Sequence, residues 1–108
     1  MNLRALKMTE AQFTDRVIQT AKLYGWLVTH FRPAKTAKGW RTALQGDSGF
    51  VDLVLARAGV VIHAELKVGR GRPRPDQISW AQAIGETHRL WYPEDWDEIV
   101  ATLRRQRL

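Results

Sequence analysis

The chain has 108 residues, of which 44% are hydrophobic and 26% are charged, so we expect one folded domain over residues 1–108. The absence of cysteine excludes disulfides, thiolate metal sites and thiol nucleophiles. Lys and Arg number 17 against 11 Asp and Glu, and the net charge of +6 favours a polyanionic partner. No apolar run reaches the ~18 residues of a membrane span, and the N-terminus lacks an apolar signal core, so we expect a cytoplasmic protein without a membrane partner.

In chain order, the hydrophobic pattern predicts alternating helices and strands. A capping-box sequence at Thr9–Gln12 precedes apolar residues at helical spacing, which predicts a helix over 9–24. Residues 33–48 lack periodicity and predict a long loop. The other expected elements are strands over 26–31, 50–56, 60–68 and 88–92 and helices over 76–84 and 94–106. The order α-β-β-β-α-β-α predicts an α/β (α+β) fold, with a mixed four-stranded sheet flanked by helices.

The second and third predicted strands are separated by only three residues and must form an antiparallel hairpin. If the turn takes two residues, Ala58 and Gly59, Asp52 lies directly across from Glu65, with their Cβ atoms about 5 Å apart. Side chains alternate along a strand, so Lys67 shares the face of Asp52 and Glu65, and the apolar residues of both strands share the other face. A three-residue loop would shift the strand register, and the apolar residues of the two strands would then no longer share one face.

Two facing carboxylates repel each other, so Asp52 and Glu65 need compensating positive charge. Lys67 supplies part of it, and a divalent cation such as Mg²⁺, which prefers carboxylate and water oxygens, supplies the rest. A metal ion held in this way activates water and neutralises charge on a scissile phosphate. Glu-x-Lys alone is usually a solvated pair, so the prediction of a metal site depends on Asp52, which is placed between bulky apolar residues.

Two basic segments without acidic residues adjoin this hairpin and predict contacts with a nucleic-acid backbone. Their candidate binding residues are Arg32, Lys35, Lys38, Trp40 and Arg41 before the hairpin and Arg70, Arg72 and Arg74 after it. The Trp40 side chain suits either stacking on an unpaired base or anchoring of its loop. The three histidines, His30, His63 and His88, fall on different strands and have no ligand spacing.

The chain resembles the VRR-NUC branch of the PD-(D/E)XK nuclease superfamily. The resemblance lies in Gly49–Leu53 (GFVDL), Glu65–Lys67 (ELK) and Gln77–Trp80 (QISW), and it covers nearly the whole chain. It departs from the family at Val51, where the family usually has proline. Valine keeps the strand extended and donates a backbone hydrogen bond, so we expect altered local geometry without loss of the chemistry.

The resemblance implies a restriction-endonuclease-like fold with Mg²⁺ or Mn²⁺ as cofactor. Its implied metal ligands are Asp52, Glu65, the backbone carbonyl of Leu66 and Glu10, and its implied catalytic residues are Asp52, Glu65, Lys67 and Gln77. For Glu10, a role in stabilising the helix dipole is an equal alternative. Helical spacing independently turns Gln77 toward the sheet, where Lys67 or a bound phosphate is the expected partner.

The resemblance further implies a metal-dependent DNA endonuclease that cuts branched DNA, as Holliday-junction resolvases do, in a bacterial or phage-infected bacterial cell. A domain of this size presents little surface to a junction, so we expect a homodimer. The last helix, with Trp96, Ile99, Val100 and Leu103, supplies either core packing or a partner face. Two alternatives stay open: a non-catalytic nucleic-acid-binding module, and a small RNA-processing nuclease on the same scaffold.

Overall fold

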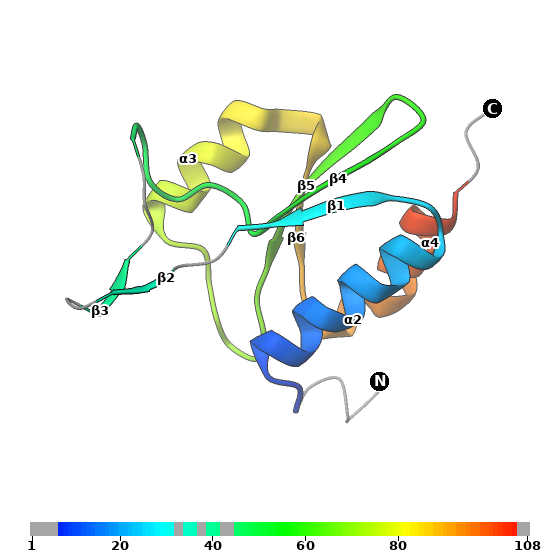
Figure 1. Cartoon of the computed structure of the whole chain (residues 1–108), viewed down its shortest axis with the longest axis horizontal. Helices are drawn as coiled ribbons and strands as arrows, with labels where there is room; N and C mark the ends of the chain where they lie inside the picture. Colours follow the sequence, from blue (N-terminus) through cyan, green and yellow to red (C-terminus); the bar gives the residue numbers. More distant parts are fainter. Residues whose placement is uncertain (1–6, 32–33, 37–38, 42–44, 106–108) are drawn as a thin grey trace.

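The computed structural model describes residues 7–31, 34–36, 39–41 and 45–105, with only the backbone described for 34–36 and 39–41. The helices are α2 (Glu10–Leu23), α3 (Pro75–Ile84) and α4 (Trp96–Arg104), with 3₁₀ turns η1 (Gly85–Thr87) and η2 (Pro93–Asp95). The strands are β1 (Leu27–His30), β2 (Ala34–Thr36), β3 (Gly39–Arg41), β4 (Leu53–Arg57), β5 (Val60–Leu66) and β6 (His88–Trp91) (Figure 1). Apart from β2 and β3, the predicted order α-β-β-β-α-β-α is confirmed.

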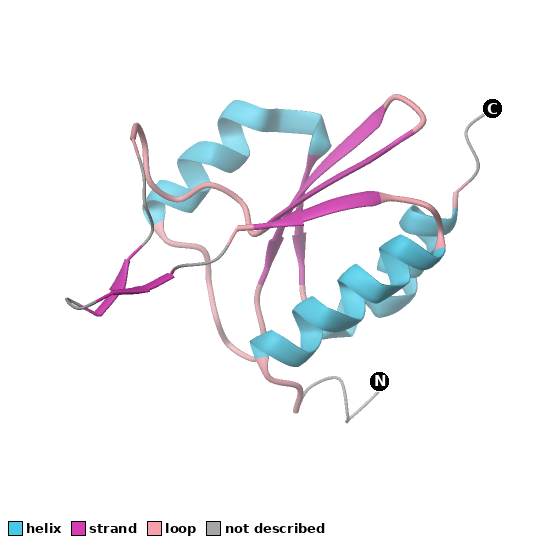
Figure 2. Cartoon of the chain, in the orientation of Figure 1, coloured by secondary structure: helices cyan, strands magenta, loops and turns pink. Residues whose placement is uncertain are grey.

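A mixed four-stranded sheet in the order β1-β4-β5-β6 forms the centre of this single compact α+β domain. Strand β4 is antiparallel to β1 and to β5, whereas β6 is parallel to β5. A parallel neighbour needs a crossover connection, and α3 provides it between β5 and β6. Helices α2 and α4 lie together on one side of the sheet and α3 lies on the other (Figure 2).

The hydrophobic core lies between the sheet and the pair α2 and α4. Its fully buried side chains include Phe13, Val17, Leu53, Leu55, Leu66, Ile99 and Leu103. Ile99 and Leu103, the two buried residues of α4, therefore pack in the core, which is one of the two roles expected for the last helix. Trp96 at the start of α4 is covered by the guanidinium of Arg16, 4.2 Å from the ring centroid.

The N-terminal capping box is confirmed. Thr9 Oγ1 accepts a hydrogen bond from the Gln12 amide at 3.1 Å, and Gln12 Oε1 accepts one from the Thr9 amide at 3.0 Å. At the other end of the chain, the helix predicted from residue 94 begins later, at Trp96, because Pro93–Asp95 forms a 3₁₀ turn. The carboxylate of Asp95 fixes this turn by accepting from the Tyr92 amide at 2.9 Å.

The prediction of a structureless loop over 33–48 was wrong for two short segments. Strands β2 and β3 pair antiparallel, with Ala34 opposite Arg41 and Thr36 opposite Gly39. Three-residue strands are too short to produce a recognisable alternation in the sequence, so only pairing reveals them. Within the described ranges, no helix is long and apolar enough to cross a bilayer.

Candidate metal centre

The β4–β5 hairpin turns at Ala58 and Gly59, as predicted. Their φ angles are +51° and +82°, and Arg57 is paired with Val60. Two consecutive positive φ angles define the turn type that matches the twist of antiparallel strands. Because a two-residue turn fixes the register, Leu53 and Leu55 of β4 face the core together with Ile62, Ala64 and Leu66 of β5, and Glu65 faces α3.

Asp52 lies one residue before β4, where regular pairing with β5 is interrupted. Its amide donates to the Ala64 carbonyl at 3.1 Å, although Ala64 is the pairing partner of Leu53. Two residues therefore oppose one, as in a β-bulge, and the predicted direct opposition of Asp52 and Glu65 is corrected. Asp52 Oδ2 instead accepts from the Leu66 amide at 2.7 Å, so the bulge brings this carboxylate against the end of β5.

Glu65 lies on the face of β5 that α3 covers, and it is only 2% exposed. Both of its carboxyl oxygens are buried, and no described residue donates a hydrogen bond to the ionised carboxylate. When Glu65 is protonated, it shares a hydrogen bond with the Asp52 carboxyl. Burial first, and then the neighbouring Asp52 carboxyl, raise the pKa of Glu65 to about 8, although the charges of Lys67 and Arg74 oppose the change. A buried carboxylate without a partner is costly, so the site favours a proton or a cation at this pair.

The oxygen atoms gathered here fit a hard divalent cation. Mg²⁺ and Mn²⁺ take carboxylate, backbone carbonyl and water oxygens. In an extended strand the N–H and C=O of one residue point the same way, so the Leu66 carbonyl points to the side from which Asp52 accepts the Leu66 amide. The carboxylates of Asp52 and Glu65 and this carbonyl are thus the groups that would hold the ion.

Glu10, the further predicted ligand, is not brought to this pair. It is exposed in the first turn of α2, where its charge suits the helix dipole. Among the described residues, no group of three acidic or histidine side chains is arranged to hold a metal ion. A cation bound by Asp52 and Glu65 would therefore complete its coordination with water molecules or phosphate oxygens.

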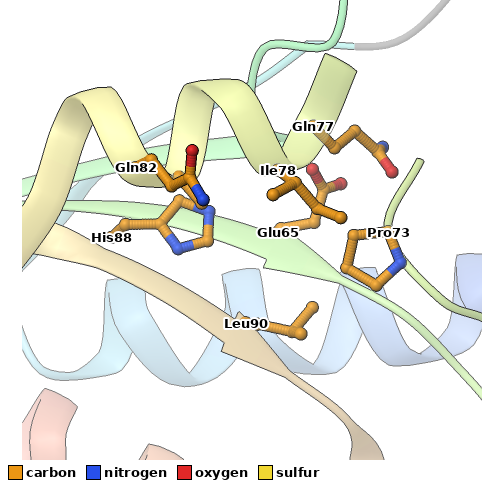
Figure 3. Close-up of a pocket in the computed structure, with 8 residues that line it drawn as sticks. Glu65, Pro73, Gln77, Ile78, Gln82, His88 and Leu90 are labelled. Carbon is orange, nitrogen blue, oxygen red and sulfur yellow. The ribbon is translucent and has the colours of Figure 1, made fainter. Parts of the chain in front are cut away.

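Lys67 and Gln77 both lie close to Glu65. Lys67 is half-buried, two residues further along the chain, and close enough for its charge to lower the pKa of Glu65. Gln77 is buried in the first turn of α3 and shares with Glu65 a pocket of about 330 Å³ (Figure 3). The expected partner of Gln77 was Lys67 or a bound phosphate, but its Oε1 accepts instead from the Arg74 amide at 2.8 Å.

The loop between β5 and α3 presents exposed arginines near the acidic pair. Arg72 donates to the Tyr92 hydroxyl at 3.2 Å, and Tyr92 in turn donates to the Gly71 carbonyl at 2.7 Å. Arg74 forms an ion pair with Asp76 at 3.3 Å. Of the other predicted binding residues, Arg70 is exposed, Arg32 and Lys38 lie outside the described residues, and the backbone alone is described for Lys35, Trp40 and Arg41.

The histidines do not form a metal site, but two of them are neighbours. His63 on β5 is paired with His88 on β6, a proximity that the sequence did not reveal because parallel pairing is non-local. His63 Nδ1 lies 3.0 Å from Thr87 Oγ1. Partial burial, and then the charges of His63 and Arg89, lower the pKa of His88.

The segment just before Asp52 is held by α3, which sequence reasoning missed. Ser48 Oγ donates to Asp76 Oδ2 at 3.0 Å, and Trp80 Nε1 donates to the Ser48 carbonyl at 2.9 Å. Gly49 next to them has φ +90°, and a Cβ there would lie 2.7 Å from the backbone of Asp76. A glycine directly before the Phe-Val-Asp segment was the available signal for this close approach.

We therefore expect Gly49→Ala to lower the free energy of unfolding by about 3 kcal/mol, through backbone strain and the clash with α3. Gly46→Ala is the matched control, because its φ is +109° but no atom lies within 4 Å of the added Cβ. It should cost about 1 kcal/mol, the strain alone. Urea denaturation of both variants measures the difference, and equal losses would contradict the close packing at Gly49.

Comparison of the chain with protein-family models, with curated proteins and with solved structures finds no match.

Proposed function

We propose that the chain is a metal-dependent DNA endonuclease similar to VRR-NUC nucleases, with a restriction-endonuclease-like fold. The observation that carries the proposal is the buried carboxyl of Glu65, to which no described residue donates a hydrogen bond when it is ionised, beside the carboxyl of Asp52 on the adjacent strand. Removing a carboxylate from water without a hydrogen-bond partner destabilises a fold. A function that needs the charged pair, such as metal binding, accounts for its presence.

The topology also supports the proposal. Antiparallel strands β1, β4 and β5 are followed by α3 and by a parallel strand, β6. Asp52 lies just before β4, Glu65 lies near the end of β5, and Lys67 follows β5 directly. These two strand ends are adjacent in space because the strands are antiparallel. The resemblance places the same residue types at these positions.

In this mechanism, Asp52, Glu65 and the Leu66 carbonyl would hold Mg²⁺ or Mn²⁺, which supplies an activated water and neutralises charge on the scissile phosphate. The Lys67 ammonium, beside Glu65, orients the attacking water and stabilises negative charge that develops on the phosphate. Gln77 is a positioning residue, since it holds the Arg74 backbone where α3 begins.

DNA is the proposed partner because the chain carries a net charge of +6 and exposed arginines lie on the loop beside the acidic pair. We further propose branched DNA as the substrate and a homodimer as the active form. One domain of this size presents little surface to a junction. Two copies related by symmetry would contact two arms in the same way.

The proposal is tested by incubating the purified chain with a four-way junction, a nicked duplex, a linear duplex and a matched RNA, each with Mg²⁺, with Mn²⁺ or with EDTA. We expect cleavage of branched DNA with either metal and none with EDTA. Binding without cleavage under every condition would identify a non-catalytic module and overturn the proposal. Cleavage of RNA alone would assign the site to RNA processing.

A further inference from the structure

Three aromatic rings form a row from the end of β1 to helix α3, next to Asp52. Phe50 lies in the middle, edge-to-face with Phe31 at 5.5 Å and with Trp80 at 4.8 Å between ring centroids. The row is tied to the candidate metal centre, because the Phe31 amide donates to the Asp52 carbonyl at 2.8 Å. Phe31 is therefore placed by the backbone of a residue that we propose to hold the metal ion.

The two ends of the row differ in access and in charge. At one end, the indole N–H of Trp80 is bonded to the Ser48 carbonyl, and Asp47 and Asp76 line the adjoining pocket. These carboxylates disfavour the approach of phosphate groups. At the other end, Phe31 follows the edge strand β1 and is 48% exposed. The Phe31 ring is thus the open end of the row, away from the two aspartates.

An exposed aromatic ring held edge-on by a second ring offers a π-face for stacking. Every nucleobase has such a face, but within a duplex both faces of each base are already stacked on neighbouring bases. A protein ring can therefore stack only on a base at an end, a gap or a branch. The basic composition of the chain provides the attraction for the backbone that carries such a base.

We propose that Phe31 is the stacking platform for a nucleobase beside the scissile phosphate that lacks a stacked neighbour on one face, and that the site consequently selects DNA with such bases, at a branch point or in an unpaired arm. The inference rests on the proposed nuclease function, since Asp52 locates the phosphate. It assigns substrate selection to a residue outside the acidic motif and outside the two basic segments.

Binding measured in EDTA tests the inference without turnover. The probe is a forked DNA with 2-aminopurine in the unpaired arm next to the branch, compared with a fully paired duplex of the same sequence. Wild-type protein should bind the fork more tightly than the duplex and change the 2-aminopurine fluorescence. Phe31→Leu should weaken fork binding about tenfold and leave duplex binding unchanged, because leucine keeps the apolar volume but lacks a π-face.

Two further variants complete the experiment. Phe31→Trp retains a π-face and should preserve the preference for the fork. Leu27→Ala removes an apolar side chain that is 75% exposed on β1, the strand that Phe31 follows, and should change neither the affinity for the fork nor that for the duplex. The inference is overturned if wild-type protein shows no preference for the fork. It is also overturned if Phe31→Leu binds the fork with wild-type affinity, or if it weakens binding to the fork and to the duplex equally. Failure of the nuclease proposal would appear separately, as absence of cleavage by wild-type protein with metal.

Discussion

Replacing Asp52 by asparagine is expected to reduce metal-dependent DNA cleavage by about a thousandfold or more while DNA binding persists. Asparagine has nearly the same shape, and its side-chain oxygen can still accept the 2.7 Å hydrogen bond from the Leu66 amide, so the bulge is retained. What the variant loses is the negative charge that would bind the cation. Binding should be equal or tighter, because one charge that repels phosphate is removed.

Asp47→Asn is the matched control for this experiment. Asp47 is exposed in the segment that leads to Asp52, and its replacement makes the same change of charge outside the acidic pair. Cleavage of a labelled junction with Mg²⁺, together with binding in EDTA, measures both effects. If Asp52→Asn cuts at the wild-type rate with the same metal requirement, the acidic pair is not the catalytic site.

The second large effect concerns stability, which is expected to fall as pH rises from about 5 to 8 in the absence of metal. In the folded chain the pKa of Glu65 is about 8, whereas its ordinary value is 4.5. Between these values the folded state holds a proton that the unfolded state has released, so raising the pH favours unfolding. The stabilisation that the Glu65 proton provides is complete below the ordinary pKa of 4.5. It is lost as the pH approaches about 8, the pKa of Glu65 in the folded chain.

Glu65→Gln should remove most of this pH dependence, because the amide has no proton to lose. In EDTA at pH 8 the variant should be more stable than wild type by several kcal/mol, and near pH 5 the two should be similar. Mg²⁺ should stabilise wild type at pH 8 by binding its ionised carboxylates and should have little effect on the variant. Thermal unfolding across this pH range measures all three results.

Glu98→Gln provides the control for the stability experiment, because Glu98 is exposed on α4. Its unfolding should follow the wild-type pH profile. An unchanged pH profile in Glu65→Gln would show that the Glu65 carboxyl is not the proton-binding group.

The strand register could be predicted from the sequence because it follows from local and periodic features. A two-residue turn ending in Gly59 fixes which residues of β4 and β5 oppose each other, and the alternation of apolar residues then decides which face is buried. The capping box at Thr9 is similarly local, since its two hydrogen bonds join residues three positions apart. These features specified the fold class and the neighbourhood of Asp52 and Glu65.

The tertiary structure alone decided how the carboxyls of that neighbourhood are held. The bulge at Asp52 depends on hydrogen bonds to β5 that no sequence period encodes. The burial of Glu65 depends on α3, which crosses over the face that alternation predicts to be polar. The aromatic row from Phe31 to Trp80 joins residues 49 positions apart in the sequence.

The sequence by itself determined the order of the elements, the hairpin register and the acidic motif, because turns, caps and alternation act between residues that are close along the chain. The environment of the acidic pair, from the missing hydrogen bonds of Glu65 to its raised pKa, was decided by the tertiary structure. Desolvation depends on which distant segment covers a residue, and α3 and Glu65 meet only when the chain is folded.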